Sequence, residues 1–168
     1  MVLVTRAADP AGVFCAGLWV TGPDKAINAY PADHYPVWKT ELGLDLPAGA
    51  FGENFTTFGL LETVACIGDI FRVGRIVAQI TQPGQPCWKL ARKWRLKDFA
   101  ARVEQTGRTG WYYRVLETGK VEAPDEFRLV ERPHPEWTVA TANAIMHLRR
   151  TDWSATLALS TCPALAES

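Results

Sequence analysis

The sequence has no excess of charge of either sign and no long hydrophobic run. Its 168 residues include 18 basic and 18 acidic ones, so the formal net charge is zero. This balance removes the usual electrostatic argument for nonspecific binding to nucleic acid or to a membrane. The longest apolar runs fall far below the roughly 20 residues that a membrane helix needs, and the first residues are not a basic segment followed by an apolar core. We therefore expect a cytoplasmic protein that acts on a small molecule, with neither nucleic acid nor membrane as a partner.

Paired cysteine motifs are also absent. The four cysteines are Cys15, Cys66, Cys87 and Cys162. They lie too far apart for a Cys-x-x-Cys zinc or redox motif, and a chain of this length with 48% hydrophobic residues can bury one sizeable core without disulfides. We expect free thiols, of which Cys15 and Cys66 are buried as small hydrophobes and Cys162 has no particular role.

Cys87 is set apart by its surroundings. A strand-like apolar pattern over residues 70–82 ends at two prolines, and Cys87 follows where an amphipathic, strongly basic helical pattern begins over residues 87–96. The positive end of a helix dipole and the four cations of that segment favour the thiolate form of a cysteine at this place. The sequence therefore predicts that Cys87 is a nucleophile or a ligand for a soft metal.

Short strand patterns separated by glycines dominate the first three quarters of the chain. Apolar alternation predicts strands over residues 2–5, 13–20, 55–58, 63–66, 70–82, 111–116 and 126–130. Gly59, Gly68 and Gly74 punctuate these segments and are expected at corners of the chain. Closely spaced strands with glycine corners are typical of a small barrel.

Helical patterns occupy much of the remainder. One, over residues 33–42, has Asp33 as its expected N-cap and ends at Gly43, and His34 is expected to be exposed in its first turn. Another helix is predicted over residues 97–105, before a Gly-Arg-Thr-Gly break.

The apolar period changes from two to 3.6 after residue 135. Two helices, the second capped by Thr151-Asp152, are therefore expected to close the chain. We predict a mainly β fold with peripheral helices, in which a β-barrel domain at residues 1–135 is followed by a small helical appendage at residues 136–168.

Several motifs together carry a resemblance to a known family. They are Gly22-Pro23-Asp24-Lys25-Ala26, Tyr30-Pro31-x-x-His34-Tyr35-x-x-Trp38, Gly49-Ala50-Phe51-Gly52-Glu53-Asn54, Gly68-Asp69-Ile70-Phe71-Arg72-Val73-Gly74, Gln82-Pro83-x-x-Pro86-Cys87-Trp88-Lys89-Leu90 and Gly107-Arg108-Thr109-Gly110-Trp111-Tyr112-x-Arg114-Val115-Leu116. Over residues 22–166 the sequence resembles the MOSC domain family in its YiiM-like branch, in which a small three-helix module follows the barrel.

The resemblance implies a MOSC-type β-barrel, closed or nearly closed, that holds a molybdenum cofactor (molybdopterin). It implies reduction of N-hydroxylated bases or amines, a detoxification reaction, with Cys87 as the catalytic residue and the protein ligand of the molybdenum. A thiolate is a soft ligand, which agrees with that role. Because no Gly-x-Gly-x-x-Gly fingerprint for a dinucleotide is present, we expect a separate reductase to supply the electrons.

The matched motifs also supply the other candidate site residues. The resemblance makes Asn54 a second catalytic residue, whose amide orients the pterin or the substrate; the alternative is that Asn54 only braces its loop. The cofactor-binding candidates are Lys25, Gly52, Glu53, Arg72, Lys89, Arg108 and Arg114. Cationic side chains suit a phosphate and an anionic metal centre, although each would otherwise be an ordinary solvated surface charge. Asp69 is expected to hold Arg72 or a turn amide.

The sequence departs from the family pattern at two places. Val20 and Thr21 precede Gly22 where family members carry His-Gly-Gly, and Gly84 follows the matched proline where they carry arginine. One imidazole, a proton donor, and one guanidinium, a phosphate partner, are therefore missing. Two alternatives stay open: a metal-free cysteine enzyme or sulfur carrier, with Cys87 as nucleophile or persulfide carrier, and a protein that binds or hands over the cofactor without turnover.

The segment before Gly22 is shorter than the branch usually has, which would leave out one or two strands of the barrel. An exposed sheet edge would then have to be covered by the C-terminal helices or by a second subunit. A homodimer is one expectation that follows.

Overall fold

The computed structural model describes residues 23–122 and 125–167. The strands are β1 (Ile27–Pro31), β2 (Phe55–Thr57), β3 (Ile70–Val73), β4 (Ile76–Pro83), β5 (Trp111–Glu117) and β6 (Phe127–Glu131). The helices are α1 (Tyr35–Leu42), α2 (Trp88–Trp94), α3 (Phe99–Thr106), α4 (Val139–Asn143) and α5 (Trp153–Ser160), with short turns η1 (Pro23–Lys25), η2 (Ala32–His34) and the π-helical η3 (Ala144–Leu148). The strands predicted over residues 2–5 and 13–20, and Cys15, Val20 and Thr21, lie outside the described residues.

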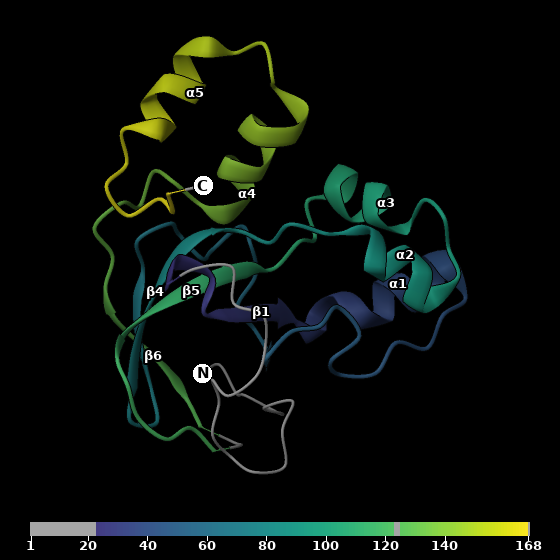
Figure 1. The fold of residues 1–168 in the computed structure, drawn as a ribbon, viewed down its shortest axis with the longest axis horizontal. Helices are drawn as coiled ribbons and strands as arrows, with labels where there is room; N and C mark the ends of the chain where they lie inside the picture. Colours follow the sequence, from purple (N-terminus) through teal and green to yellow (C-terminus); the bar gives the residue numbers. More distant parts are fainter. Residues whose placement is uncertain (1–22, 123–124, 168) are drawn as a thin grey trace.

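The six described strands form one curled sheet (Figure 1). Their order is β2-β1-β5-β4-β3-β6; β1 pairs with β2 in parallel, and the other neighbours are antiparallel. The curl brings the two ends of this order together, because the rings of Phe55 in β2 and Phe127 in β6 meet edge to face with centroids 5.5 Å apart. The two end strands touch through these side chains without a described strand pairing, so the sheet is a curled half-barrel. The predicted mainly β fold with peripheral helices is confirmed.

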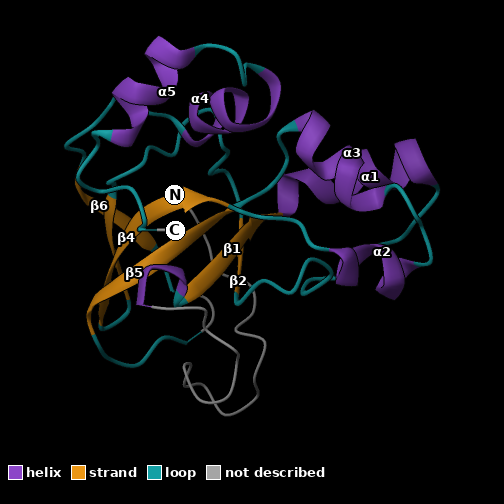
Figure 2. Ribbon diagram, turned by 45° about the horizontal axis from the view of Figure 1, so that its top comes forward, coloured by secondary structure: helices purple, strands orange, loops and turns teal. Residues whose placement is uncertain are grey.

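The closing helices pack against the sheet. Figures 1 and 2 show α4 and α5 together on one side of it, and Val139, Ile145 and Leu159 join the hydrophobic core that the strands form. Thr138 caps α4 and Asp152 caps α5, each accepting a hydrogen bond of 3.0 Å from a backbone N–H three residues further on. The capping role predicted for Asp152 is confirmed, and the division of the chain at residue 135 stays a prediction.

Helices α1, α2 and α3 form a separate lobe beside the sheet, on the right in both views. They enclose a second hydrophobic cluster that includes Trp38, Leu90 and Phe99. The Phe99 ring packs edge-on against Trp38 at 5.3 Å, and Trp38 Nε1 donates to the Tyr30 hydroxyl at 2.7 Å. The lobe is therefore anchored to β1 through a buried aromatic contact.

Two local predictions are wrong. Residues 63–66 were expected to form a strand, but residues 62–64 form a turn, with Val64 N and Ala65 N both donating to Leu61 O at 2.9 Å, and Cys66 makes only an isolated β-bridge to Thr138. Asp33 was expected to cap α1, but it lies in η2, and its carboxylate accepts from Gly59 N at 3.0 Å. In the first case Leu61 O accepts two backbone N–H groups and closes a turn instead of a strand. In the second, the Asp33 carboxylate accepts from a backbone N–H outside α1 instead of from the first turn of that helix.

Asp69 has the structural role expected of it, with a partner that the sequence did not indicate. Its carboxylate accepts from the turn amide of Cys66 at 2.9 Å. Arg132, rather than Arg72, supplies the cation, through two hydrogen bonds of 2.8 and 2.7 Å.

Within residues 23–122 and 125–167, no helix combines the length and apolar character needed to cross a bilayer.

Candidate functional site

A cavity of about 410 Å³ opens where the sheet meets the α1–α3 lobe. It is lined by Lys25, Ala26, Asn28, Ala50, Phe51, Gly52, Asn54, Gly84, Gln85, Pro86, Cys87, Lys89, Leu90, Lys93, Val103, Thr109 and Tyr112. These residues come from η1, β1, α2, α3, β5 and the loops between them. The volume lies within the range of about 300–1,000 Å³ that small-molecule sites occupy.

Cys87 lies on the wall of this cavity, and its role as a nucleophile or metal ligand stays a prediction. It is the N-cap residue of α2 with an extended backbone, and its side chain makes no capping hydrogen bond. Cys87 is exposed, whereas Cys66 and Cys162 are buried. Among the described cysteines, Cys87 alone therefore has a thiol that both faces a cavity and is open to reagents.

Alkylation near neutral pH is expected to modify Cys87 well before Cys66. Burial raises the pKa of the Cys66 thiol, and the neighbouring Asp69 carboxylate raises it further, so its thiolate forms only at more alkaline pH. Mass-spectrometric mapping of iodoacetamide adducts over time gives the order of labelling, with Cys87→Ser as the control. Equal or slower labelling of Cys87 would contradict its assignment as the accessible nucleophile.

Asn54 joins the loop after α1 to the first strand. Its Oδ1 accepts from Asn28 N at 2.8 Å, and its own N–H donates to Asn28 O at 2.8 Å. Asn54 thus braces its loop, and it also lines the cavity. Because its Nδ2 takes no part in this pair, the two roles considered for Asn54 are compatible.

Glu53 points away from the cavity, and its carboxylate is buried with 2% of the residue exposed. It accepts from Gly49 N at 2.6 Å, from Phe51 N at 3.0 Å, and from the Tyr35 hydroxyl. Burial raises the pKa of Tyr35, and the Glu53 carboxylate raises it further. Glu53 therefore holds the turn that presents Gly52, whose φ of 76° lies in the left-handed region that favours glycine.

Three lysines make the cavity electropositive. Lys25, Lys89 and Lys93 line it, and the described lining residues include no aspartate or glutamate. Lys25 Nζ donates to Gln85 Oε1 at 3.1 Å, and Lys93 Nζ donates to Gly49 O at 2.9 Å. Lys93 was not among the predicted cofactor-binding residues. Its position one helical turn after Lys89, which places both on one face of α2, could have indicated it.

The three candidate arginines do not reach this cavity. Arg72 is exposed on β3, 3.7 Å from Glu117, and Arg114 lies 3.1 Å from Asp24. Arg108 makes two hydrogen bonds of 2.8 Å to Glu41 and stacks over the Trp38 ring at 4.7 Å. The structure thus brings together five of the predicted residues, namely Cys87, Asn54, Lys25, Gly52 and Lys89, while Glu53 supports them from behind.

Gly84 allows two backbone segments to touch at the cavity wall. Gly84 N donates to Gly110 O at 2.9 Å, and a Cβ on residue 84 would lie 2.0 Å from Thr109 O. The arginine that family members carry at this place therefore cannot be added to this backbone without moving one of the segments.

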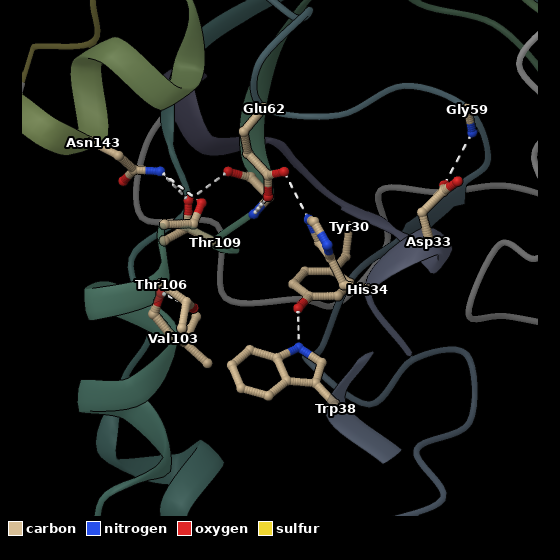
Figure 3. A network of polar contacts seen from close by, with 12 residues as sticks. Tyr30, Asp33, His34, Trp38, Gly59, Glu62, Val103, Thr106, Thr109 and Asn143 are labelled. Atoms are coloured by element: carbon tan, nitrogen blue, oxygen red, sulfur yellow. Dashed lines mark hydrogen bonds and ion pairs between the residues drawn. The ribbon is translucent and has the colours of Figure 1, made fainter. Parts of the chain in front are cut away.

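A buried polar network supports the same wall from behind (Figure 3). Glu62 accepts from Gly110 N at 2.9 Å and pairs with His34 Nε2 at 2.7 Å, and Asn143 Nδ2 donates to Thr109 Oγ1 at 2.7 Å. The expectation that His34 is exposed is wrong, since only 14% of its side chain is accessible. Residues from three distant segments thus fix Thr109, which lines the cavity.

Within the described part of the chain, no group of three or more His, Cys, Asp or Glu side chains is arranged to hold a metal ion. A metal at Cys87 would therefore have to bring further ligands with it. An organic cofactor that carries its own sulfur ligands, and that needs one protein thiolate, is compatible with this donor set.

The family model of the MOSC domain matches residues 19–128, and the chain belongs to the MOSC domain family. It is 48% identical over 124 residues to the uncharacterised protein YflK of Bacillus subtilis and 42% identical over 127 residues to protein YiiM of Escherichia coli. Each match covers 74% of this chain and 56% of the relative, so the chain spans about half the length of these curated relatives.

A third relative and two solved structures extend the comparison. A protein of Gibberella moniliformis named "Reductase" is 35% identical over 132 residues, which are 76% of this chain and 24% of that protein. The crystal structure of YiiM from Escherichia coli superposes with a TM-score of 0.87 at 35% identity, covering 99% of this chain and 86% of the other. YiiM from Geobacillus stearothermophilus gives 0.84 at 42% identity, covering 86% and 74%.

Proposed function

We propose that this protein is an oxidoreductase that reduces N-hydroxylated bases or amines at a molybdenum cofactor bound through Cys87. The observation that carries the proposal is the exposed Cys87 thiol on the wall of a cavity with three lysines and no described carboxylate. Membership of the MOSC family and the relative named "Reductase" support the reaction class.

The residues present fit an anionic cofactor with a soft metal. The Cys87 thiolate would ligate the metal, and Lys25, Lys89 and Lys93 would neutralise its phosphate and metal centre. When bound, the cofactor would pass two electrons to the substrate. The balance is one R–NHOH, two electrons and two protons giving one R–NH₂ and one water, with cleavage of the N–O bond.

Polar groups of the cavity would orient the substrate. Asn54 and Thr109 lie on the wall, where the paired hydrogen bonds to Asn28 hold Asn54 and the hydrogen bond from Asn143 Nδ2 holds the Thr109 side chain. Burial raises the pKa of Tyr112, and the adjacent Cys87 raises it further, so the Tyr112 hydroxyl stays protonated and can donate a hydrogen bond to the leaving oxygen.

The decisive measurement is molybdenum per chain after expression in a host that makes the cofactor. The parent is expected to retain the metal through purification and to reduce an N-hydroxylated base with a chemical reductant, and Cys87→Ser is expected to lose both. Serine keeps the side-chain volume but replaces the soft thiolate by a hard, poorly ionised hydroxyl. Cys162→Ser, at a buried cysteine outside the cavity, is the matched control and should retain the metal.

A metal-free thiol enzyme or sulfur carrier is the second candidate. The close approach at Gly84 favours it, because this chain has no room there for the phosphate-binding arginine of the family. Absence of molybdenum from the parent and from Cys87→Ser, with rapid alkylation of Cys87 in the parent, would support this candidate over the first.

A further inference from the structure

Helix α2 and the residues just after it present exposed cations, of which Lys89 also lines the cavity while Arg92, Arg95 and Lys97 do not. Between Asp69 and Asp98 the sequence contains no acidic residue. Lys89, Arg92, Arg95 and Lys97 are exposed in this stretch, and none forms an ion pair with any residue in the described ranges. In a chain of zero net charge, this is a local concentration of unneutralised positive charge beside Cys87.

An exposed tryptophan lies within the same surface. Trp88 follows Cys87 directly, is 63% exposed, and has the Arg92 guanidinium 5.9 Å from its ring centroid. Tryptophan and arginine are the residue types most enriched among the energetic centres of protein interfaces. We call Trp88, Lys89, Arg92, Arg95 and Lys97 the α2 surface.

Arg95 occupies a backbone conformation that glycine or asparagine would adopt more easily. It is the C-cap residue of α2 with a φ of 56°. Within residues 23–122 and 125–167, all other residues with a positive φ are glycines. The left-handed conformation is disfavoured for a residue that carries a Cβ. A cation is therefore kept at a place where the local structure alone favours glycine.

The α2 surface is too extended to serve only the ligand of the cavity. Arg92, Arg95 and Lys97 are outside the cavity lining, and a seven-residue helix is about 10 Å long. Figure 2 shows α2 on the outer side of the helical lobe, away from α4, α5 and β6. A partner can approach this surface without contacting the C-terminal helices.

We propose that the α2 surface docks an acidic, electron-donating flavoprotein next to Cys87. This inference rests on the proposed function, since that reaction consumes two electrons and the sequence has no dinucleotide fingerprint of its own. Opposite charge speeds association and orients the partners in weak redox complexes. The balance is two flavin hydroquinones oxidised to semiquinones, each giving one electron, for every N–O bond that is reduced.

The test compares a protein donor with a small donor that needs no docking surface. Reduced flavodoxin, a small acidic FMN protein, is the first probe, and photoreduced riboflavin, which has no phosphate, is the second. The variant is Arg92→Glu/Arg95→Glu. The control is Arg75→Glu/Arg128→Glu, which changes the net charge equally at exposed positions in the β3–β4 turn and on β6.

The rate constant with flavodoxin is expected to fall about tenfold or more in the α2 variant at low salt, and to depend less on ionic strength than in the parent. Turnover with riboflavin should be unchanged. An equal loss in the control variant, or no loss in either, would overturn the inference. If the parent is active with riboflavin, either of these results overturns only the docking inference. The proposed function then still holds.

A binding titration separates the two hypotheses if the parent has no reductase activity. Oxidised flavodoxin is titrated against the protein while tryptophan fluorescence is recorded. Saturable quenching that is lost in Arg92→Glu/Arg95→Glu, and kept in the control, supports docking without reference to turnover. Absence of flavodoxin binding, with an oligonucleotide binding through Arg92 and Arg95 instead, would assign the surface to nucleic acid and refute the proposal.

Discussion

Replacement of Arg132 by methionine is expected to lower the free energy of unfolding by about 3–5 kcal/mol, because it leaves a buried carboxylate without its cation. Asp69 is 0% exposed, and two of the three described hydrogen bonds to its carboxylate come from the Arg132 guanidinium. The same guanidinium donates to Val64 O at 3.0 Å. A single substitution therefore removes the partners of both the carboxylate and a turn carbonyl.

Urea unfolding of the parent and of Arg132→Met at neutral pH measures this loss. Arg128→Met is the matched control, since Arg128 lies on β6, is exposed, and is 3.8 Å from Glu126; a surface pair of this kind contributes about 0–1 kcal/mol. Asp69→Asn/Arg132→Met should recover part of the loss, because the amide removes the unpaired charge. A decrease below about 1 kcal/mol in Arg132→Met would show that water reaches the carboxylate.

A methyl group at position 84 is expected to destabilise the protein by about 3 kcal/mol, at the upper end of overpacking effects. The Cβ of Gly84→Ala would lie 2.0 Å from Thr109 O, which is a backbone atom, and the position of a Cβ is itself fixed by the backbone, so neither atom can rotate away. Accommodation requires either the loop before Cys87 or the segment before β5 to move. The substitution should therefore also change the rate at which Cys87 is alkylated.

Gly43→Ala separates steric from torsional strain. Gly43 has φ of 66°, but a Cβ there would meet nothing within 4 Å, so the expected loss is about 1 kcal/mol from backbone conformation alone. Thermal unfolding of both variants gives the comparison. If Gly84→Ala is as stable as Gly43→Ala or more so, the two segments are not held as closely as their hydrogen bond indicates, and arginine at position 84 becomes compatible with this fold.

The position of Cys87 could be predicted from the sequence because its determinants are local. Two prolines end β4, and an apolar and basic period begins α2 immediately afterwards. The strands β3, β4, β5 and β6 were recognisable for the same reason, since each lies in a short apolar or alternating run.

The strand β1 and the shared lobe of α1–α3 could not be predicted from local patterns. The strand β1 has only five residues and ends at Pro31, and its pairing is with the distant segments β2 and β5. The lobe depends on Trp38, Leu90 and Phe99, which belong to three different helices. Period and propensity reveal the apolar face of a helix but not the face that it meets.

The cationic candidates show a similar division. Lysines at positions 25 and 89 line the cavity, while Arg72, Arg108 and Arg114 pair with Glu117, Glu41 and Asp24. Each of these carboxylates is far from its arginine in the sequence, so motif membership could not distinguish a cofactor ligand from one half of an ion pair. Glu53 likewise turned inward because its donors lie in the turn just before it and on α1.

The place of β1 in the sheet determines when the cavity can exist during synthesis. β1 leaves the ribosome early, yet its antiparallel neighbour is β5, which emerges only after β2, β3, β4 and three helices have been made. Until then β1 can pair among the described strands only with the three-residue β2, and long-range pairing of this kind is slow to form. Asn28 and Tyr112 face each other across β1 and β5 and both line the cavity. A nascent chain therefore has no enclosed pocket until β5 has been translated, because two walls of the cavity come from strands that are distant in the sequence.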